Sequence, residues 1–102
     1  GLSFMSIVSQ NGETLHNHYH GNVLEGGRLL LVDAGAETNM NYCSDFTRTI
    51  PVNGKFTVRQ KDIYDIVLAA NSRTFELARP GAFYWQMHNA AARIIAGSRS
   101  SD

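Results

Sequence analysis

A chain of 102 residues in which nine basic and nine acidic side chains cancel gives no electrostatic reason to expect a nucleic acid or an anionic membrane surface as partner. Cys43 is the single cysteine, which excludes an internal disulfide and favours a reducing compartment, so a cytoplasmic location is expected. No apolar run approaches the roughly 20 residues that span a bilayer, and no charged-then-apolar leader opens the chain.

The first half of the chain has the pattern of strands separated by polar turns. Residues 2–9 alternate loosely between apolar and polar and predict a strand, with one face formed by Leu2, Phe4, Ser6 and Val8. Residues 14–22 are polar and histidine-rich, and are expected to be extended or looping. Two further strands are predicted over 28–34 and 42–50, and Pro51 with Asn53-Gly54 should end the sheet.

The second half predicts two helices. Thr57 with Gln60 three residues later forms a possible capping box, so a helix should begin after Thr57. Its apolar stripe is expected at helical spacing, in Ile63, Ile66, Val67, Ala70, Thr74 and Leu77. Pro80-Gly81 should end it, and a second helix is predicted over about 84–96. Strands followed by helices indicate an α+β fold in which an antiparallel sheet packs with two helices.

Two aspartates carry most of the chemistry. Asp33 ends the apolar strand and Asp45 opens the next one. If the chain reverses near Asn39, the two aspartates pair directly across a hairpin, with Cα atoms roughly 4.5–5.5 Å apart. Carboxylates so placed repel unless a proton or a cation lies between them, and a divalent metal pair needs such bridging oxygen ligands. Taken alone, either aspartate is more simply interpreted as capping a turn.

Several segments in this order resemble the pita-bread metallopeptidases, in the branch of the Xaa-Pro aminopeptidases (aminopeptidase P) and prolidases. They are LH at 15–16, LVDAGAE at 31–37, SDFTRT at 44–49, PVNGKFT at 51–57, IYDIVLAA at 63–70 and RPG at 79–81. The resemblance implies that residues 1–96 form the N-terminal half of a catalytic domain, half of a pita-bread (creatinase/aminopeptidase-like) fold. Residues 97–102 would be a flexible tail. The family usually has one residue fewer between its aspartates, so a longer turn or a bulge should absorb the difference.

The resemblance also implies roles for three residues. Asp33 and Asp45 would be metal ligands, and His16 would contact substrate as a catalytic residue. Two divalent ions are implied, Mn²⁺ first, with Co²⁺ or Zn²⁺ as alternatives. The family's other ligands, one histidine and two glutamates, come from later motifs that this sequence does not contain. We therefore expect the isolated chain to be inactive, with an empty site or a loosely held ion.

The implied activity is that of a metal-dependent aminopeptidase or dipeptidase that cleaves Xaa-Pro bonds, and its partner is a peptide with proline at the second position. The alternative is a non-catalytic pita-bread module that binds peptides or proteins. Neither nucleic acid nor membrane is expected as a partner. Apolar surface left uncovered in half a fold predicts a homodimer or a higher oligomer.

The remaining candidate residues have simpler interpretations. On a strand, His16, His18 and His20 would share one face and could chelate a metal, but a solvated loop is favoured for His18 and His20. His88 is expected at the surface or in packing, Arg48 in packing or supporting the site, and Cys43 at an ordinary strand position. Tyr84 and Trp85 are expected in the core or at the interface between the two halves of the fold.

Overall fold

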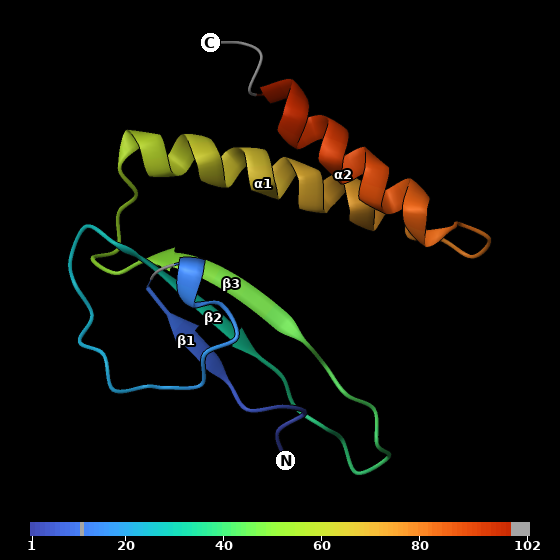
Figure 1. Ribbon diagram of the computed structural model, residues 1–102. Coiled ribbons are helices and arrows are strands. Elements are labelled where there is room, and N and C mark those ends of the chain that lie inside the picture. The colour runs from blue at the N-terminus through green and yellow to red at the C-terminus, as the bar shows by residue number, and fades with distance from the viewer. Residues whose placement is uncertain (11, 99–102) are drawn as a thin grey trace. The chain divides into compact units, whose positions relative to one another are not determined.

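The computed structural model describes residues 1–10 and 12–98, which fall into two compact units, Gly1–Phe56 and a second unit that begins at Thr57 (Figure 1). The first unit contains β1 (Ile7–Ser9), a short 3₁₀ helix η1 (Gly12–Thr14), β2 (Leu29–Ala34) and β3 (Phe46–Pro51). The second contains α1 (Val58–Leu77) and α2 (Tyr84–Ser98). This order confirms the α+β class. No helix among the described residues is both long and apolar enough to cross a membrane.

The three strands form an antiparallel sheet in the order β1-β2-β3, so the apolar strand β2 is central. Ile7 of β1 pairs with Asp33 of β2, and Asp33 pairs on its other side with Thr47 of β3. Because paired residues project to the same face of a sheet, Ile7, Asp33 and Thr47 share one face. Ile7 is 3% exposed, so this is the face of the sheet that shields a side chain from solvent.

The N-terminal strand is shorter than predicted and is interrupted by a bulge. Leu2 forms an isolated bridge with Ala36, and regular pairing resumes only at Ile7 with Asp33. Between these pairings the first strand advances five residues while β2 advances three. The predicted continuous strand over residues 2–9 is therefore wrong. The two extra residues leave Leu2 and Val8 on one face of the sheet, but Phe4 lies within the bulge and lines a cavity together with Ile7, so it does not share the predicted face.

The third strand begins later and ends later than predicted. The predicted start at residue 42 is wrong, since β3 begins at Phe46 and Cys43 makes only an isolated bridge with Glu37. Pro51, predicted to break the sheet, is instead the last residue of β3 and still pairs with Leu29. β3 is an edge strand, and an edge position tolerates the missing N–H of proline.

The start of α1 follows the capping prediction. The Gln60 N–H donates to Thr57 Oγ1 at 3.1 Å, and the Thr57 N–H donates to Gln60 Oε1 at 2.9 Å. The helix ends at Leu77, three residues before Pro80, where the Ala78 N–H donates to the Thr74 carbonyl at 3.0 Å.

The second helix extends beyond its predicted end. α2 reaches Ser98, so the flexible tail predicted from Gly97 begins inside a helix, and residues 99–102 lie outside the described part of the chain. The predicted apolar stripe of α1 is only partly covered. Ala70 is 4% exposed, whereas Ile63 and Val67 are more than half exposed.

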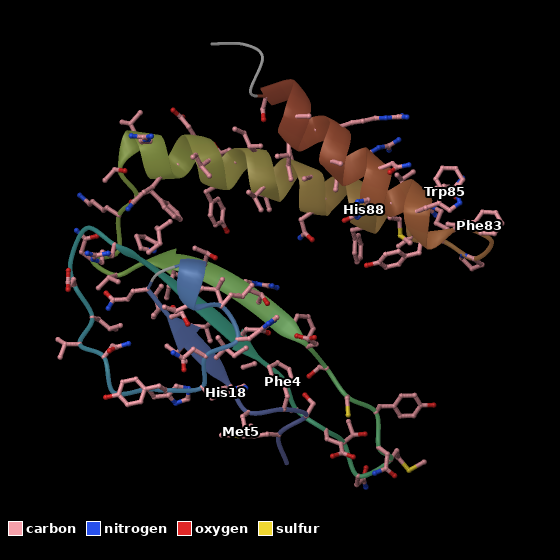
Figure 2. The ribbon with its side chains drawn as sticks, viewed as in Figure 1. Phe4, Met5, His18, Phe83, Trp85 and His88 are labelled. Atoms are coloured by element: carbon pink, nitrogen blue, oxygen red, sulfur yellow. The ribbon has the colours of Figure 1, made fainter. Side chains whose placement is uncertain are left out.

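Few side chains are closed off from solvent. Within the described residues only Ile7, Ser9 and Ala70 are buried. At the start of α2, Phe83, Tyr84 and Trp85 are all exposed, and the rings of Phe83 and Trp85 stack with centroids 6.4 Å apart (Figure 2). Tyr84 and Trp85 therefore do not lie in a core of this chain, and the predicted role at an interface between halves stays a prediction.

Candidate metal site

The hairpin that carries both aspartates turns through a three-residue loop. The Thr38 N–H donates to the Tyr42 carbonyl at 2.9 Å, and the Asn41 N–H donates to the Thr38 carbonyl at 3.0 Å. Asn41 has φ 65°, the left-handed conformation that such loops need in their last residue. The turn is thus centred on Met40 rather than Asn39.

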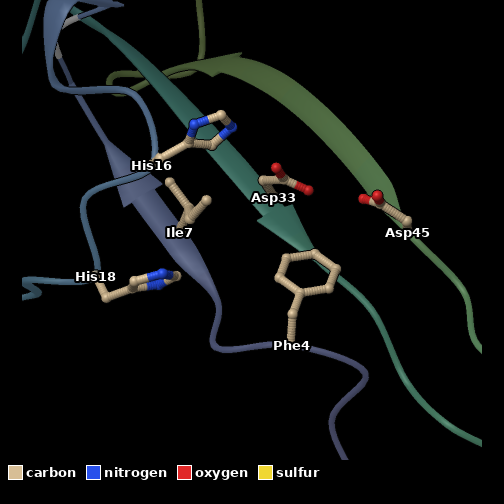
Figure 3. Close-up of a pocket in the computed structure, with 6 residues that line it drawn as sticks. All are labelled: Phe4, Ile7, His16, His18, Asp33 and Asp45. Carbon is tan, nitrogen blue, oxygen red and sulfur yellow. The ribbon is translucent and has the colours of Figure 1, made fainter.

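This difference of one residue corrects the predicted pairing. Moving the centre of a hairpin by one residue moves each pairing partner by two, so Asp33 lies opposite Thr47 and not opposite Asp45. Asp45 precedes Phe46, the first residue of β3, and is the diagonal neighbour of Asp33 on the same face. The prediction of direct pairing is wrong, whereas the prediction that the two side chains share a face is confirmed. Figure 3 shows the two carboxylates pointing toward each other.

The electrostatics of the pair indicate a site built for positive charge. Asp33 is half-buried, and its Oδ1 is buried with no hydrogen-bond partner among the described residues. A hydrogen bond with the Asp33 carboxyl, then loss of solvation, then repulsion by the Asp33 charge raise the pKa of Asp45 above its ordinary value. An unpartnered buried oxygen is costly unless a proton or a cation meets it. These two carboxyl groups therefore fit a divalent cation, which prefers oxygen ligands of this kind.

The aspartates line a cavity of about 290 Å³ with apolar and imidazole walls (Figure 3). Its other lining residues are Phe4, Ile7, His16 and His18. Phe4 reaches the cavity from the bulged segment before β1, so the bulge that upset the strand prediction contributes a wall of the site.

His16 lies where the sequence placed it, beside the aspartates, and its backbone is unusual. It is the third residue of a turn in which the Asn17 N–H donates to the Thr14 carbonyl at 3.2 Å, and its φ is 66°. Residues other than glycine adopt this conformation uncommonly, although histidine does so more often than most. Its imidazole points toward Asp33 (Figure 3). A strained residue that lines a cavity is typical of a functional position.

His18 also lines the cavity, although sequence reasoning favoured a solvated loop for it. Its alternation with His16 was the available signal, but that signal pointed to His20 equally, and the segment forms no strand. His20 Nε2 lies 2.8 Å from the Ser6 carbonyl. Among the described residues no group of three or more histidine, cysteine or acidic side chains could hold a metal ion, so the three-histidine chelate does not form.

The remaining candidates are not among the residues that line this cavity. Cys43 is a free, exposed thiol, and His88 is exposed on α2 (Figure 2). Arg48 places its guanidinium carbon 5.7 Å from the centre of the Phe46 ring and donates to the Thr47 carbonyl at 2.8 Å.

Comparisons with known proteins agree on one family. The family model described as "Metallopeptidase family M24" matches residues 1–100. The Xaa-Pro aminopeptidase of Haemophilus influenzae is 44% identical over 94 residues, covering 90% of this chain and 22% of that protein. Xaa-Pro aminopeptidase 1 of Streptomyces coelicolor is 42% identical over 96 residues, covering 94% of this chain and 20% of that protein.

The fold agrees as well. The solved structure of the prolidase from Pyrococcus furiosus matches with a TM-score of 0.84 at 35% sequence identity, over 94% of this chain and 28% of that one. The pita-bread fold class expected from the sequence is thereby confirmed. The chain spans about a fifth of the length of these curated relatives.

Proposed function

The chain belongs to metallopeptidase family M24, and from that membership we propose that it supplies part of the active site of an Xaa-Pro aminopeptidase or dipeptidase. The substrate would be a peptide with proline at its second position, and the scissile bond the one before that proline. The names of the relatives, Xaa-Pro aminopeptidase and prolidase, support this substrate class. In this proposal Asp33 and Asp45 hold divalent metal, and His16 contacts the substrate.

One observation carries the proposal. Asp33 Oδ1 is buried without a hydrogen-bond partner in the described part of the chain, beside a carboxyl group whose pKa that same aspartate raises. A structural turn cap would satisfy its carboxylate with backbone N–H groups. An acceptor left open next to a second acid is instead what a metal ligand needs before the metal binds.

The chemistry divides between the ions and the chain. When bound, divalent ions supply the Lewis acidity that activates water and polarises a peptide carbonyl. His16 would donate a hydrogen bond from its imidazole to the substrate carbonyl, or carry a proton near neutral pH. Phe4 and Ile7 line the same cavity, and their apolar side chains would displace water around the bound peptide.

The donor set bears on which metal binds and on what else the site needs. Two carboxylates are hard oxygen ligands, which favours Mn²⁺, with Co²⁺ or Zn²⁺ as alternatives. From the family membership we propose that the remaining ligands come from the second half of the catalytic domain. Residues 1–96 would then be the first half of a catalytic domain.

The test uses a protein of the relatives' length that contains this chain. Mn²⁺-dependent release of the first residue from an Xaa-Pro peptide is expected, and Asp45→Asn should reduce kcat/KM by about a thousandfold or more, as loss of a metal ligand does to metal-assisted hydrolysis. Asp62→Asn, an exposed acid on α1, is the matched control and should leave the rate unchanged. A metal-independent rate, or equal rates for Asp45→Asn and the parent, would refute the proposal.

A further inference from the structure

The β-ladder is altered at one pair of residues, Ala36 and Ser44, next to the site. In a regular antiparallel pair, hydrogen-bonded partners exchange two backbone bonds. Here the Ser44 N–H donates to the Ala36 carbonyl at 2.9 Å, as expected. The Ala36 N–H, however, donates to Ser44 Oγ at 2.9 Å, and the Ser44 hydroxyl lies 3.2 Å from the Ala36 carbonyl, to which it donates. The Ser44 side chain thus takes the place of its own carbonyl.

The displaced Ser44 carbonyl contacts Ser3 and Gly35. It accepts a hydrogen bond from Ser3 Oγ at 2.6 Å. It also lies against Gly35, where a Cβ would collide with the Ser44 carbonyl oxygen and with Ser3 Oγ, and would lie 2.7 Å from the Ser44 carbonyl carbon. Since no side chain fits between them, this position of the carbonyl requires glycine at residue 35.

The displacement acts on Asp45 through covalent geometry. The Ser44 carbonyl and the Asp45 N–H belong to one planar peptide group, so turning the carbonyl out of the ladder turns the start of Asp45 with it. The Cβ atoms of diagonal neighbours on a sheet are ordinarily up to about 7–8 Å apart, so two such carboxylates approach each other only when both side chains are turned inward. Figure 3 shows the Asp33 and Asp45 carboxylates pointing toward each other, and both line the same cavity.

We propose that Ser44 is a positioning residue for the aspartate pair: its hydroxyl holds the Ser44–Asp45 peptide out of the ladder, Ser3 and Gly35 receive the displaced carbonyl, and the Asp45 carboxylate is thereby directed at Asp33. The geometry stands whether or not a metal binds. Its consequence for metal affinity rests on the proposed function.

The first experiment is made without metal, on the 102-residue chain. Scalar coupling through hydrogen bonds, measured by NMR, reports whether the Ala36 amide nitrogen is bonded to the carbonyl of residue 44. No coupling is expected in the parent chain. Ser44→Ala should produce it and reorient the Asp45 N–H vector, because the Ala36 N–H then loses the hydroxyl and the ladder carbonyl is the acceptor that regular antiparallel pairing offers it. Ser44→Thr keeps a hydroxyl and should behave as the parent.

Ser9→Ala is the matched control, since Ser9 is a buried serine on β1 whose hydroxyl has no partner among the described residues. If Ser44→Ala does not fold, Ser3→Ala tests the same arrangement by removing the donor to the displaced carbonyl, and the Asp45 N–H vector should again turn. An Asp45 N–H vector that is unchanged in the folded variant, Ser44→Ala or Ser3→Ala, would overturn the proposal.

The second experiment adds Mn²⁺ and follows paramagnetic broadening of the Asp33 and Asp45 amide signals. Ser44→Ala should raise the Kd for Mn²⁺ by about fivefold, the effect of losing one hydrogen bond, while Ser44→Thr and Ser9→Ala keep the parent affinity. Absence of broadening in the parent would count against the metal site, while the metal-free coupling would still decide the role of Ser44. Equal affinity in parent and Ser44→Ala would overturn the link between positioning and binding.

Discussion

Asp33 and Asp45 lie so close together that ionising both carboxyl groups costs free energy, because their negative charges repel. The raised pKa of Asp45 means that the folded chain binds a proton there more tightly than the unfolded chain does. The contribution of this proton to stability is therefore fully present below the ordinary aspartate pKa and is lost as the pH rises through the raised pKa of Asp45. At neutral pH the metal-free chain retains a repulsion that a cation would relieve.

We accordingly expect Asp45→Asn to stabilise the metal-free chain at pH 7. The gain should shrink toward pH 4, where Asp45 in the parent chain is increasingly protonated and the repulsion is absent. Thermal unfolding of both chains across this pH range measures the difference. A Tm difference that stays constant with pH would show that the charge of Asp45 contributes nothing to it. Divalent metal should reverse the order, raising the Tm of the parent more than that of the variant.

His16 shows the same conflict between stability and function in its backbone. With φ 66° it adopts a conformation that costs non-glycine residues of order 1–3 kcal/mol. We expect His16→Gly to keep or increase stability, by up to about 1 kcal/mol, while the longer protein loses peptidase activity. Urea unfolding and kcat/KM measure the two effects. His18→Gly is the control. The φ of His18 is not positive, so glycine relieves no strain there and this variant should lose stability. A destabilised His16→Gly would show that the imidazole holds the loop.

At the scale of elements, local chemistry was predictable from the sequence and register was not. The capping box of Thr57 and Gln60 fixed the start of α1, because both hydrogen bonds lie within four residues. The pairing of Asp33 depended on which residue of the Asn39–Asn41 loop takes the left-handed conformation, and both ends of the loop are asparagine. Phe4 and Ser3 were missed as parts of the site because the bulge before β1 forms only when the strands pair.

The capping box gives a test at this scale. Thr57→Ala removes the hydroxyl that accepts from the Gln60 N–H at the start of α1, and loss of such an N-cap should cost about 1 kcal/mol of stability. Thr57→Ser retains the hydroxyl and should cost much less. Chemical denaturation measures both variants. If the two variants lost the same amount, the methyl group of Thr57, rather than its hydroxyl, would be the stabilising part.

At the scale of the whole molecule, the exposed apolar surface is large for so short a chain. Phe75, Phe83, Tyr84 and Trp85 are each 60% or more exposed, and each aromatic side chain carries on the order of 150–250 Å² of surface. Monomers rarely expose contiguous apolar patches beyond a few hundred Å². In a protein of the relatives' length, other segments of the polypeptide are available to cover such a surface.

In a solution of the 102-residue chain alone, a second copy can cover these exposed aromatic side chains. We therefore expect reversible self-association at micromolar concentration. Trp85→Ser should shift the equilibrium toward monomer, because it removes an exposed ring stacked on Phe83. Tyr42→Ser, an aromatic residue 77% exposed on the hairpin of the first unit, is the matched control and should leave the equilibrium unchanged. Sedimentation velocity over a concentration series measures the association. A parent chain that remains monomeric throughout would refute the expected self-association.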